Sequence, residues 1–327
     1  MTMLALSVWA RFMTFSFYQH ALIAGVVIGV ACALLSVFVV HKRMAFIGQG
    51  ISHSAFGGVG LALLLQLYLP ATRPPLVRDA IVAAFCVTAA VLIGRLTRGR
   101  RVSADSAIGI CLVAAMAIGV LLLDLRTHLF RRMAEAGLLD RAELGYTPSF
   151  HDILFGSVLS IPVADVWLAV IEGGCVVLVV LAFFKELVFF TADEEAAEVF
   201  GVPVGFVYYG LLVCIALTIV IAMRLFGVIL CSALFILPGA TASFWSNRVG
   251  RVALVSALLA AACVTLGLFL SIWIGVLSTG PLIVLVMALA FGASWAWHTL
   301  REGKARLAGR AVPRHHHRHT HPDQHPG

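Results

Sequence analysis

Long stretches without charged residues divide the chain, and their lengths predict membrane-spanning helices. A transmembrane helix needs about 20 mostly apolar residues to cross a hydrocarbon core of about 30 Å. Seven stretches have this character, the fifth interrupted only by Glu172: 21–40, 51–69, 80–94, 107–123, 166–184, 202–223 and 225–247. The uncharged stretch 252–300 is too long for one crossing and contains Gly275, Gly280 and Pro281 near its middle, so it predicts two helices. We therefore expect an all-α integral membrane protein with eight or nine transmembrane helices.

Composition and charge support a lipid bilayer as the solvent. Hydrophobic residues make up 61% of the chain and charged residues only 12%, whereas soluble domains contain about 25% charged residues. The net charge of +7 comes largely from basic residues in the segments between apolar stretches. Such short basic segments stay cytoplasmic. With nine crossings, the amino terminus is expected outside, the carboxyl terminus inside and segment 125–150 outside, and no nucleic-acid partner is implied.

Two common kinds of site are missing from the sequence. The seven cysteines all fall in apolar stretches and show no CxxC spacing, so neither a disulfide framework nor a thiolate metal site is indicated. The chain also lacks a G-x-x-x-x-G-K-[ST] phosphate loop. We therefore expect a non-enzymatic chain that does not hydrolyse ATP itself.

Two polar segments have a distinctive composition. Thr191 is followed by the acidic residues of 193–195, and Gly201 and Pro203 follow closely, which predicts a short capped helix in a cytoplasmic loop. The tail 301–327 carries six histidines among Pro, Arg and Thr, so we expect it to be a disordered cytoplasmic extension of a membrane domain covering 1–300. This tail is either a metal buffer or sensor or an incidental basic extension.

Candidate chemistry lies in segment 44–60, MAFIGQGISHSAFGGVG, where the second predicted helix begins. On a helix, Gln49, His53 and Gly57 share one face, beside a stripe of small residues, Gly50, Ser54 and Gly58. Small residues allow close helix packing in membranes, so we expect His53 to face a protein interior or a cavity. Its neutral imidazole suits first-row metal ions, although a lone histidine also serves as a hydrogen-bonded packing residue.

This segment resembles the signature of metal-ion permeases of ABC importers, which transport zinc, manganese or iron. In that signature a basic pair and Met precede Gly-Asp-x-x-Ser/Ala-His-Ala/Ser. The matching residues are Lys42, Arg43, Met44, Gly48, Gln49, Ser52, His53 and Ser54. Segment 223–242 resembles a second conserved stretch of the family, and the likeness recurs at 154–156 and at Phe200 and Gly201. Gln49 departs from the usual Asp, and a neutral oxygen binds Zn²⁺ or Mn²⁺ more weakly than a carboxylate.

The resemblance implies a fold, a function and partners. It implies the permease fold of metal and vitamin B12 importers in the bacterial cytoplasmic membrane, moving divalent ions, with zinc slightly favoured over manganese or iron. It also implies a second permease copy, ATP-binding cassette subunits and an extracytoplasmic metal-binding protein, with no permanently bound cofactor. On this reading His53 is the first-choice candidate for a metal contact, and Gln49 is a weak or indirect oxygen ligand. The segment that couples transport to ATP hydrolysis comprises Asp193, Glu194, Glu195, Phe200 and Gly201.

Three alternatives remain open from the residues. A permease of the same architecture could carry a metal chelate or an organic cofactor, and only the signature argues against it. A secondary metal transporter would be expected to carry more carboxylates or histidines within its helices. An intramembrane metalloenzyme is disfavoured because the chain has no H-E-x-x-H motif. Of the other ionisable residues near apolar stretches, Arg224 is expected to extend to the outer interface, and Asp165 and Glu172 are expected to share one helix face.

Overall fold

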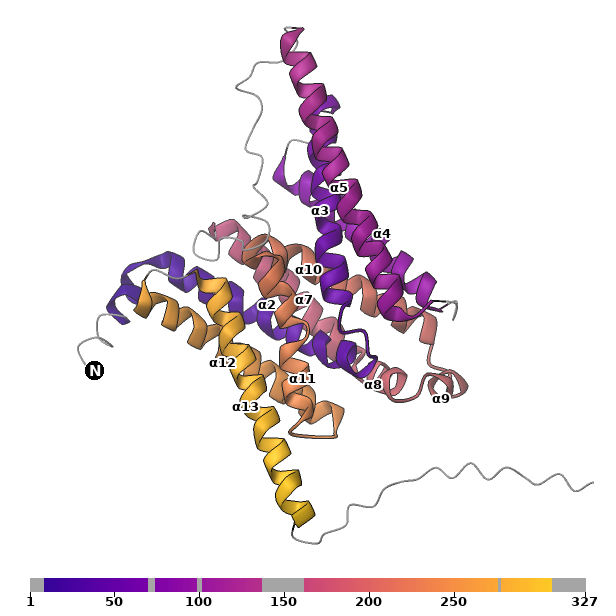
Figure 1. Cartoon of the computed structure of the whole chain (residues 1–327), viewed down its shortest axis with the longest axis vertical. Coiled ribbons are helices and arrows are strands. Elements are labelled where there is room, and N and C mark those ends of the chain that lie inside the picture. Colours follow the sequence, from indigo (N-terminus) through magenta and orange to yellow (C-terminus); the bar gives the residue numbers. More distant parts are fainter. Residues whose placement is uncertain (1–8, 70–73, 99–101, 137–161, 276–277, 308–327) are drawn as a thin grey trace, which may run out of the picture.

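The protein is built from helices (Figure 1). The computed structural model describes residues 9–69, 74–98, 102–136, 162–275 and 278–307, and these contain no strand. The helices are α2 (Ser16–His41), α3 (Ile47–Tyr68), α4 (Pro75–Arg98), α5 (Ala104–Glu135), α7 (Val163–Ala182), α8 (Phe184–Ala192), α9 (Glu194–Val199), α10 (Val204–Leu234), α11 (Leu237–Ser243), α12 (Val249–Ile274) and α13 (Thr279–Leu307).

The predicted all-α membrane architecture is confirmed. Within the described ranges, eight helical segments are long and apolar enough to cross a membrane, and the sixth, Val204–Ser243, is 40 residues long. Two helices exceed their predicted limits, because α5 continues to Glu135 and α13 to Leu307. Residues 308–327 of the histidine-rich tail and the family match at 154–156 lie outside the described residues.

The sixth segment turns back on itself at Gly227, so that the eight helical segments contain all nine predicted apolar stretches. Gly227 has φ 77° and ψ 170°, a conformation essentially restricted to glycine. Before the turn, Phe226 lies against Gly25 of α2; beyond it, Leu234 lies against Gly29, and the Gly239 amide donates to Ser36 Oγ at 2.7 Å. The second limb therefore returns along α2, so the predicted stretches 202–223 and 225–247 form two limbs of one segment.

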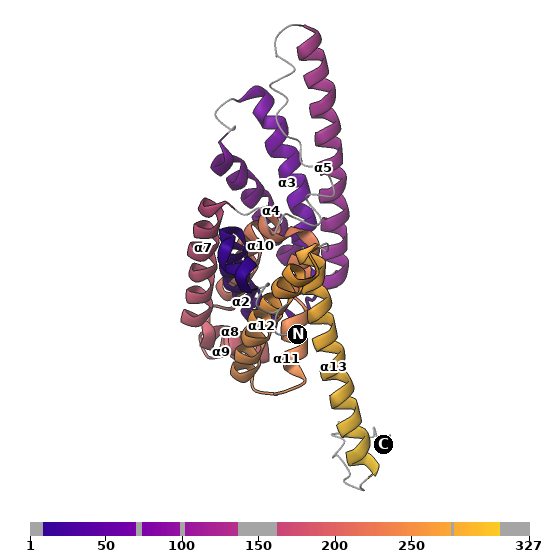
Figure 2. The same ribbon diagram turned by 90° about the vertical axis from the view of Figure 1, so that its left-hand side faces the viewer.

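The helices form two groups joined by α10. One group, here called the three-helix arm, consists of α3, α4 and α5 and projects from one end of the molecule (Figures 1 and 2). In the other group, α2 packs on α7 and α12, and α12 packs on α13. Helix α10 contacts both α3 and α4 of the arm as well as α2 and α7. Any relative movement of the two groups would therefore involve α10.

Several connections gather on one side of the molecule. The Cys86 thiol, midway along α4, lies 3.9 Å from the Ile51 carbonyl near the start of α3, and Gly58 further along α3 lies against Val82. Helix α4 therefore runs antiparallel to α3 and ends on the side where α3 starts. The start of α10 is nearby, because a Cβ on Gly205 would meet Arg98 at the end of α4. Lys42 pairs with Glu194 of α9. These connections contain the basic segments predicted to be cytoplasmic, so we assign this side to the cytoplasm.

Candidate functional site

Helix α3 carries the sequence-predicted metal contacts on a partly open face. Gln49 and His53 are one turn apart and both are half-buried. The neighbouring small residues are buried, as predicted. A Cβ on Gly50 would come within 2.6 Å of Ile108 on α5, and one on Gly58 within 3.1 Å of Phe85 on α4. The small stripe therefore fixes α3 within the three-helix arm and leaves the face with Gln49 and His53 only partly covered.

One chain does not assemble a complete metal site in its described part. No group of three or more His, Cys, Asp or Glu side chains is close enough there to hold a metal ion. Zinc sites usually use four ligands, and manganese prefers six oxygen-rich positions. Gln49 and His53 supply one carboxamide oxygen and one imidazole nitrogen. Their role as metal contacts stays a prediction, and it requires further donors from water or from another chain.

The acidic segment forms the predicted short helix, but Asp193 caps it, whereas Thr191 belongs to the end of α8 and donates to the Leu187 carbonyl. Asp193 precedes α9, and its Oδ1 accepts a hydrogen bond from the Ala196 amide at 3.0 Å. Gly201 ends the helix with φ 82°, and the amides of Gly201 and Val202 donate to the Glu198 and Ala197 carbonyls, each at 3.0 Å. These bonds form a Schellman motif, in which glycine is favoured. Gly201 therefore has a structural role whether or not it contacts another protein.

The end of α9 presents apolar side chains to the surroundings. Val199 is 84% exposed and Phe200 is 76% exposed. One edge of Phe200 is supported by Phe189 of α8, at 5.5 Å between ring centroids. Large exposed apolar groups beside acidic residues, on a helix outside the spanning segments, are typical of a protein contact surface. The structure therefore gives this segment a shape suited to docking.

Sequence reasoning did not pair the basic turn after α2 with the acidic helix α9. Lys42 Nζ lies 3.1 Å from Glu194 Oε2 and 3.7 Å from the centroid of the Phe190 ring of α8. Both segments were predicted to be cytoplasmic, but their opposite charges alone did not identify partners. The pairing depends on how α8 packs against α2, where the rings of Phe38 and Phe184 meet edge to face with 6.0 Å between their centroids.

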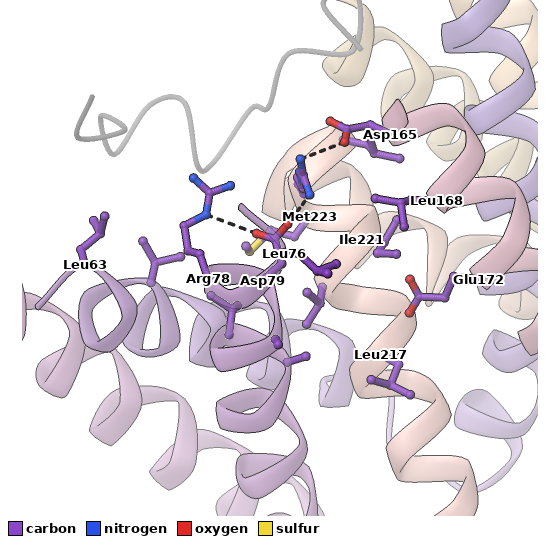
Figure 3. Close-up of a pocket in the computed structure, with 17 residues that line it drawn as sticks. Leu63, Leu76, Arg78, Asp79, Asp165, Leu168, Glu172, Leu217, Ile221 and Met223 are labelled. Atoms are coloured by element: carbon purple, nitrogen blue, oxygen red, sulfur yellow. Dashed lines mark hydrogen bonds and ion pairs between the residues drawn. The ribbon is translucent and has the colours of Figure 1, made fainter. Parts of the chain in front are cut away.

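A second ionic cluster lies at the opposite side, around a cavity of about 450 Å³ (Figure 3). Arg224 of α10 forms ion pairs with Asp79 of α4 and, at 2.8 Å, with Asp165 of α7. Asp165 and Glu172 line the same cavity, which confirms that they share a face of α7. Arg224 was expected only to extend to the outer interface, but its guanidinium also bridges α4 and α7. Sequence analysis missed Asp79, which stands at the start of an otherwise ordinary apolar helix.

The chain is similar to known proteins over most of its length. The model of the ABC 3 transport family matches residues 14–297. The manganese transport system membrane protein MntC of Halalkalibacterium halodurans is 29% identical over 287 residues, covering 87% of this chain and 88% of the relative. The chelated iron transport system membrane protein YfeD of Yersinia pestis is 32% identical over 296 residues, covering 89% of each chain.

Solved structures agree with these sequence relatives. A chain of PsaBC from Streptococcus pneumoniae, solved in complex with a Fab, is 28% identical with a TM-score of 0.71 and covers 89% of this chain and 95% of its own. A putative metal-chelate type ABC transporter in an inward-facing conformation shares the fold with a TM-score of 0.56 at 16% identity. The apolar helices and these bacterial relatives identify a multi-pass protein of the bacterial cytoplasmic membrane. With the family model matching most of its length, the chain belongs to the ABC 3 transport family.

Proposed function

We propose that this chain is the permease subunit of an ATP-driven importer that moves divalent metal ions into the cytoplasm. The observation that carries the proposal is the partly open face of α3, where His53 and Gln49 stand one turn apart while the small residues beside them are buried. Ionisable side chains within spanning helices are energetically costly, and they commonly mark the pathway of a substrate or ion. Family membership supports the same conclusion.

The proposed assembly contains a second permease copy, ATP-binding cassette subunits and an extracytoplasmic metal-binding protein. A second copy would supply the donors that one chain lacks, because His53 from each copy could then line a shared pathway. The chain has no phosphate-binding loop, so a partner must supply ATP hydrolysis. The exposed apolar end of α9, with Phe200 and the acidic residues before it, is the surface we assign to that partner.

Manganese is the first ion to test. Relatives of this chain are named for manganese and for chelated iron. The slight preference for zinc inferred from the resemblance has no further support. Gln49 offers an amide oxygen, which suits Mn²⁺ better than it suits a thiolate-seeking ion. Zn²⁺ and Fe²⁺ remain the competitors in the experiment.

The test is uptake of radioactive Mn²⁺, Zn²⁺ and Fe²⁺ by a transporter-deficient bacterial host that expresses this chain with its ATP-binding subunit and its extracytoplasmic metal-binding protein. We expect uptake of at least one free ion at limiting concentration, and its loss in His53→Ala without loss of protein from the membrane. Unchanged uptake by the variant would reject the assignment of His53. Uptake of only chelated metal or of an organic cofactor would instead support the alternative permease function.

A further inference from the structure

We propose that Lys42 is a positioning residue that transmits movement of α9 to α3, the helix with the metal contacts. This inference rests on the proposed function, because it assigns a transmission route between the two surfaces named there. Its basis is the contact of Lys42 with Glu194 of α9 and Phe190 of α8 across the cytoplasmic side.

The Lys42 contact is better protected than an ordinary surface ion pair. The Lys42 side chain is only 18% exposed, while that of Glu194 is 44% exposed. Its ammonium group lies over the ring of Phe190, which is fully buried and packs on Tyr208 of α10 at 6.0 Å between ring centroids. A cation held between a carboxylate and an aromatic face has fewer alternative positions than a solvated lysine. Lys42 thus connects α9, α8 and the end of α2 at one point.

The turn from Lys42 to α3 is short and rigid. Helix α2 ends in a Schellman motif, in which the Arg43 amide donates to the Val40 carbonyl at 3.1 Å and the Met44 amide to the Val39 carbonyl at 2.9 Å. Arg43 takes the left-handed conformation with φ 55°, and it is the only residue other than glycine with positive φ in the described ranges. An arginine is strained there, so the neighbouring contacts hold the turn in this form.

Helix α3 follows directly from this turn. Met44 is buried, and its carbonyl accepts the Ile47 amide at 2.9 Å where α3 begins. On the far side of α3, a Cβ on Gly48 would come within 3.0 Å of Phe235, in the returning limb of the sixth segment. No flexible linker separates Lys42 from α3, so a displacement of Lys42 would also move Gln49 and His53.

Helix α9, on the other side of the Lys42–Glu194 ion pair, is capped at both of its ends. Asp193 caps its start and the Gly201 motif closes it, so its six residues move as a unit. Glu194 is the first residue of α9, and the exposed apolar residues that we assign to the ATP-binding partner lie at the opposite end of this short helix. The ion pair between Lys42 and Glu194 thus joins two rigid segments from separate parts of the sequence.

The experiment measures the coupling ratio, metal transported per ATP hydrolysed, in proteoliposomes that contain the full permease and its ATP-binding subunit and are supplied with the extracytoplasmic metal-binding protein. Lys42→Glu and Glu194→Lys should each lower this ratio by about twofold to fivefold, the upper part of the range expected for loss of one partly exposed ion pair. The double variant Lys42→Glu with Glu194→Lys should recover most of the ratio, because the pair is rebuilt with reversed charges. Lys42→Arg should retain it.

Arg251→Gln is the control, since it removes a positive charge from an exposed side chain at the start of α12, outside the proposed route. It should leave the ratio unchanged. If Lys42 had only a structural role, its replacement would reduce transport, ATP hydrolysis and thermal stability together. The ratio of metal transported to ATP hydrolysed would then stay unchanged, and that result would overturn the inference. So would failure of the double variant to recover. If the unaltered protein transports no metal ion in this assay, the proposed function itself is wrong, which is a separate outcome.

Discussion

The guanidinium of Arg224 on α10 lies 2.8 Å from the carboxylate of Asp165 near the start of α7. Arg224 stands three residues before Gly227, where the chain turns back. The same guanidinium pairs with Asp79 of α4. Helices α4 and α7 belong to the two different helix groups. One side chain therefore holds the groups together next to the turn of the segment that joins them.

Replacing Arg224 by Gln should destabilise the protein by about 1–2 kcal/mol. Breaking a fully buried ion pair costs about 3–5 kcal/mol, and the smaller value applies here because the three side chains are 13–31% exposed. Thermal unfolding in detergent, followed by fluorescence size-exclusion, measures the effect. Arg251→Gln is the control, because Arg251 is exposed at the start of α12. Equal stability of the two variants would show that the cluster does not hold the helix groups together.

Replacing Gly227 by Ala should cost about 1–3 kcal/mol, because a side chain is strained at φ 77° and ψ 170°. Gly210→Ala is a control within the same helix. A Cβ at Gly210 meets no atom within 4 Å, and alanine there should be neutral or stabilise by about 0.5–1 kcal/mol. The same unfolding assay distinguishes the variants, and a Gly227→Ala protein as stable as Gly210→Ala would contradict the assigned turn.

Replacing Gly60 by Ala should disrupt the packing of α3 on α5. A Cβ there would lie 2.8 Å from the Gly119 carbonyl oxygen and 3.2 Å from the Cβ of Leu122. Because the first of these contacts is backbone, the helices must separate, at a cost of about 1–3 kcal/mol. Gly109→Ala on α5 is the control, since nothing lies within 4 Å of its added Cβ. A loss of stability in both variants alike would argue against close packing as the cause.

Replacing Gln49 by Asp should strengthen the proposed metal contact. A carboxylate one turn from His53 adds a charged oxygen donor, and we expect the KM for Mn²⁺ uptake to fall about tenfold, equivalent to about 1.4 kcal/mol. Gln49→Asn keeps the amide on the shorter side chain and is the matched control. Uptake kinetics at varied Mn²⁺ concentration provide the measurement. An unchanged KM in the Asp variant would remove residue 49 from the metal contacts.

Much of the architecture could be predicted from the sequence because the bilayer imposes a simple rule. Backbone polar groups must be satisfied within each spanning segment, so long apolar stretches such as 21–40 become helices wherever the chain folds. The capped helix α9 was also predictable, because Asp193 and Gly201 act on backbone groups within one turn. The helical face shared by Gln49 and His53 follows from helix geometry alone.

Tertiary structure decided how these helices and side chains meet. The stretches 202–223 and 225–247 already predicted two crossings, but only the tertiary structure places the turn between them at Gly227 and packs the second limb along α2. The partners of Arg224 and Lys42 lie far away in the sequence, and opposite charge alone does not select among many carboxylates. Helix formation depends on neighbours within a few residues, whereas ion pairing between helices depends on which surfaces pack together.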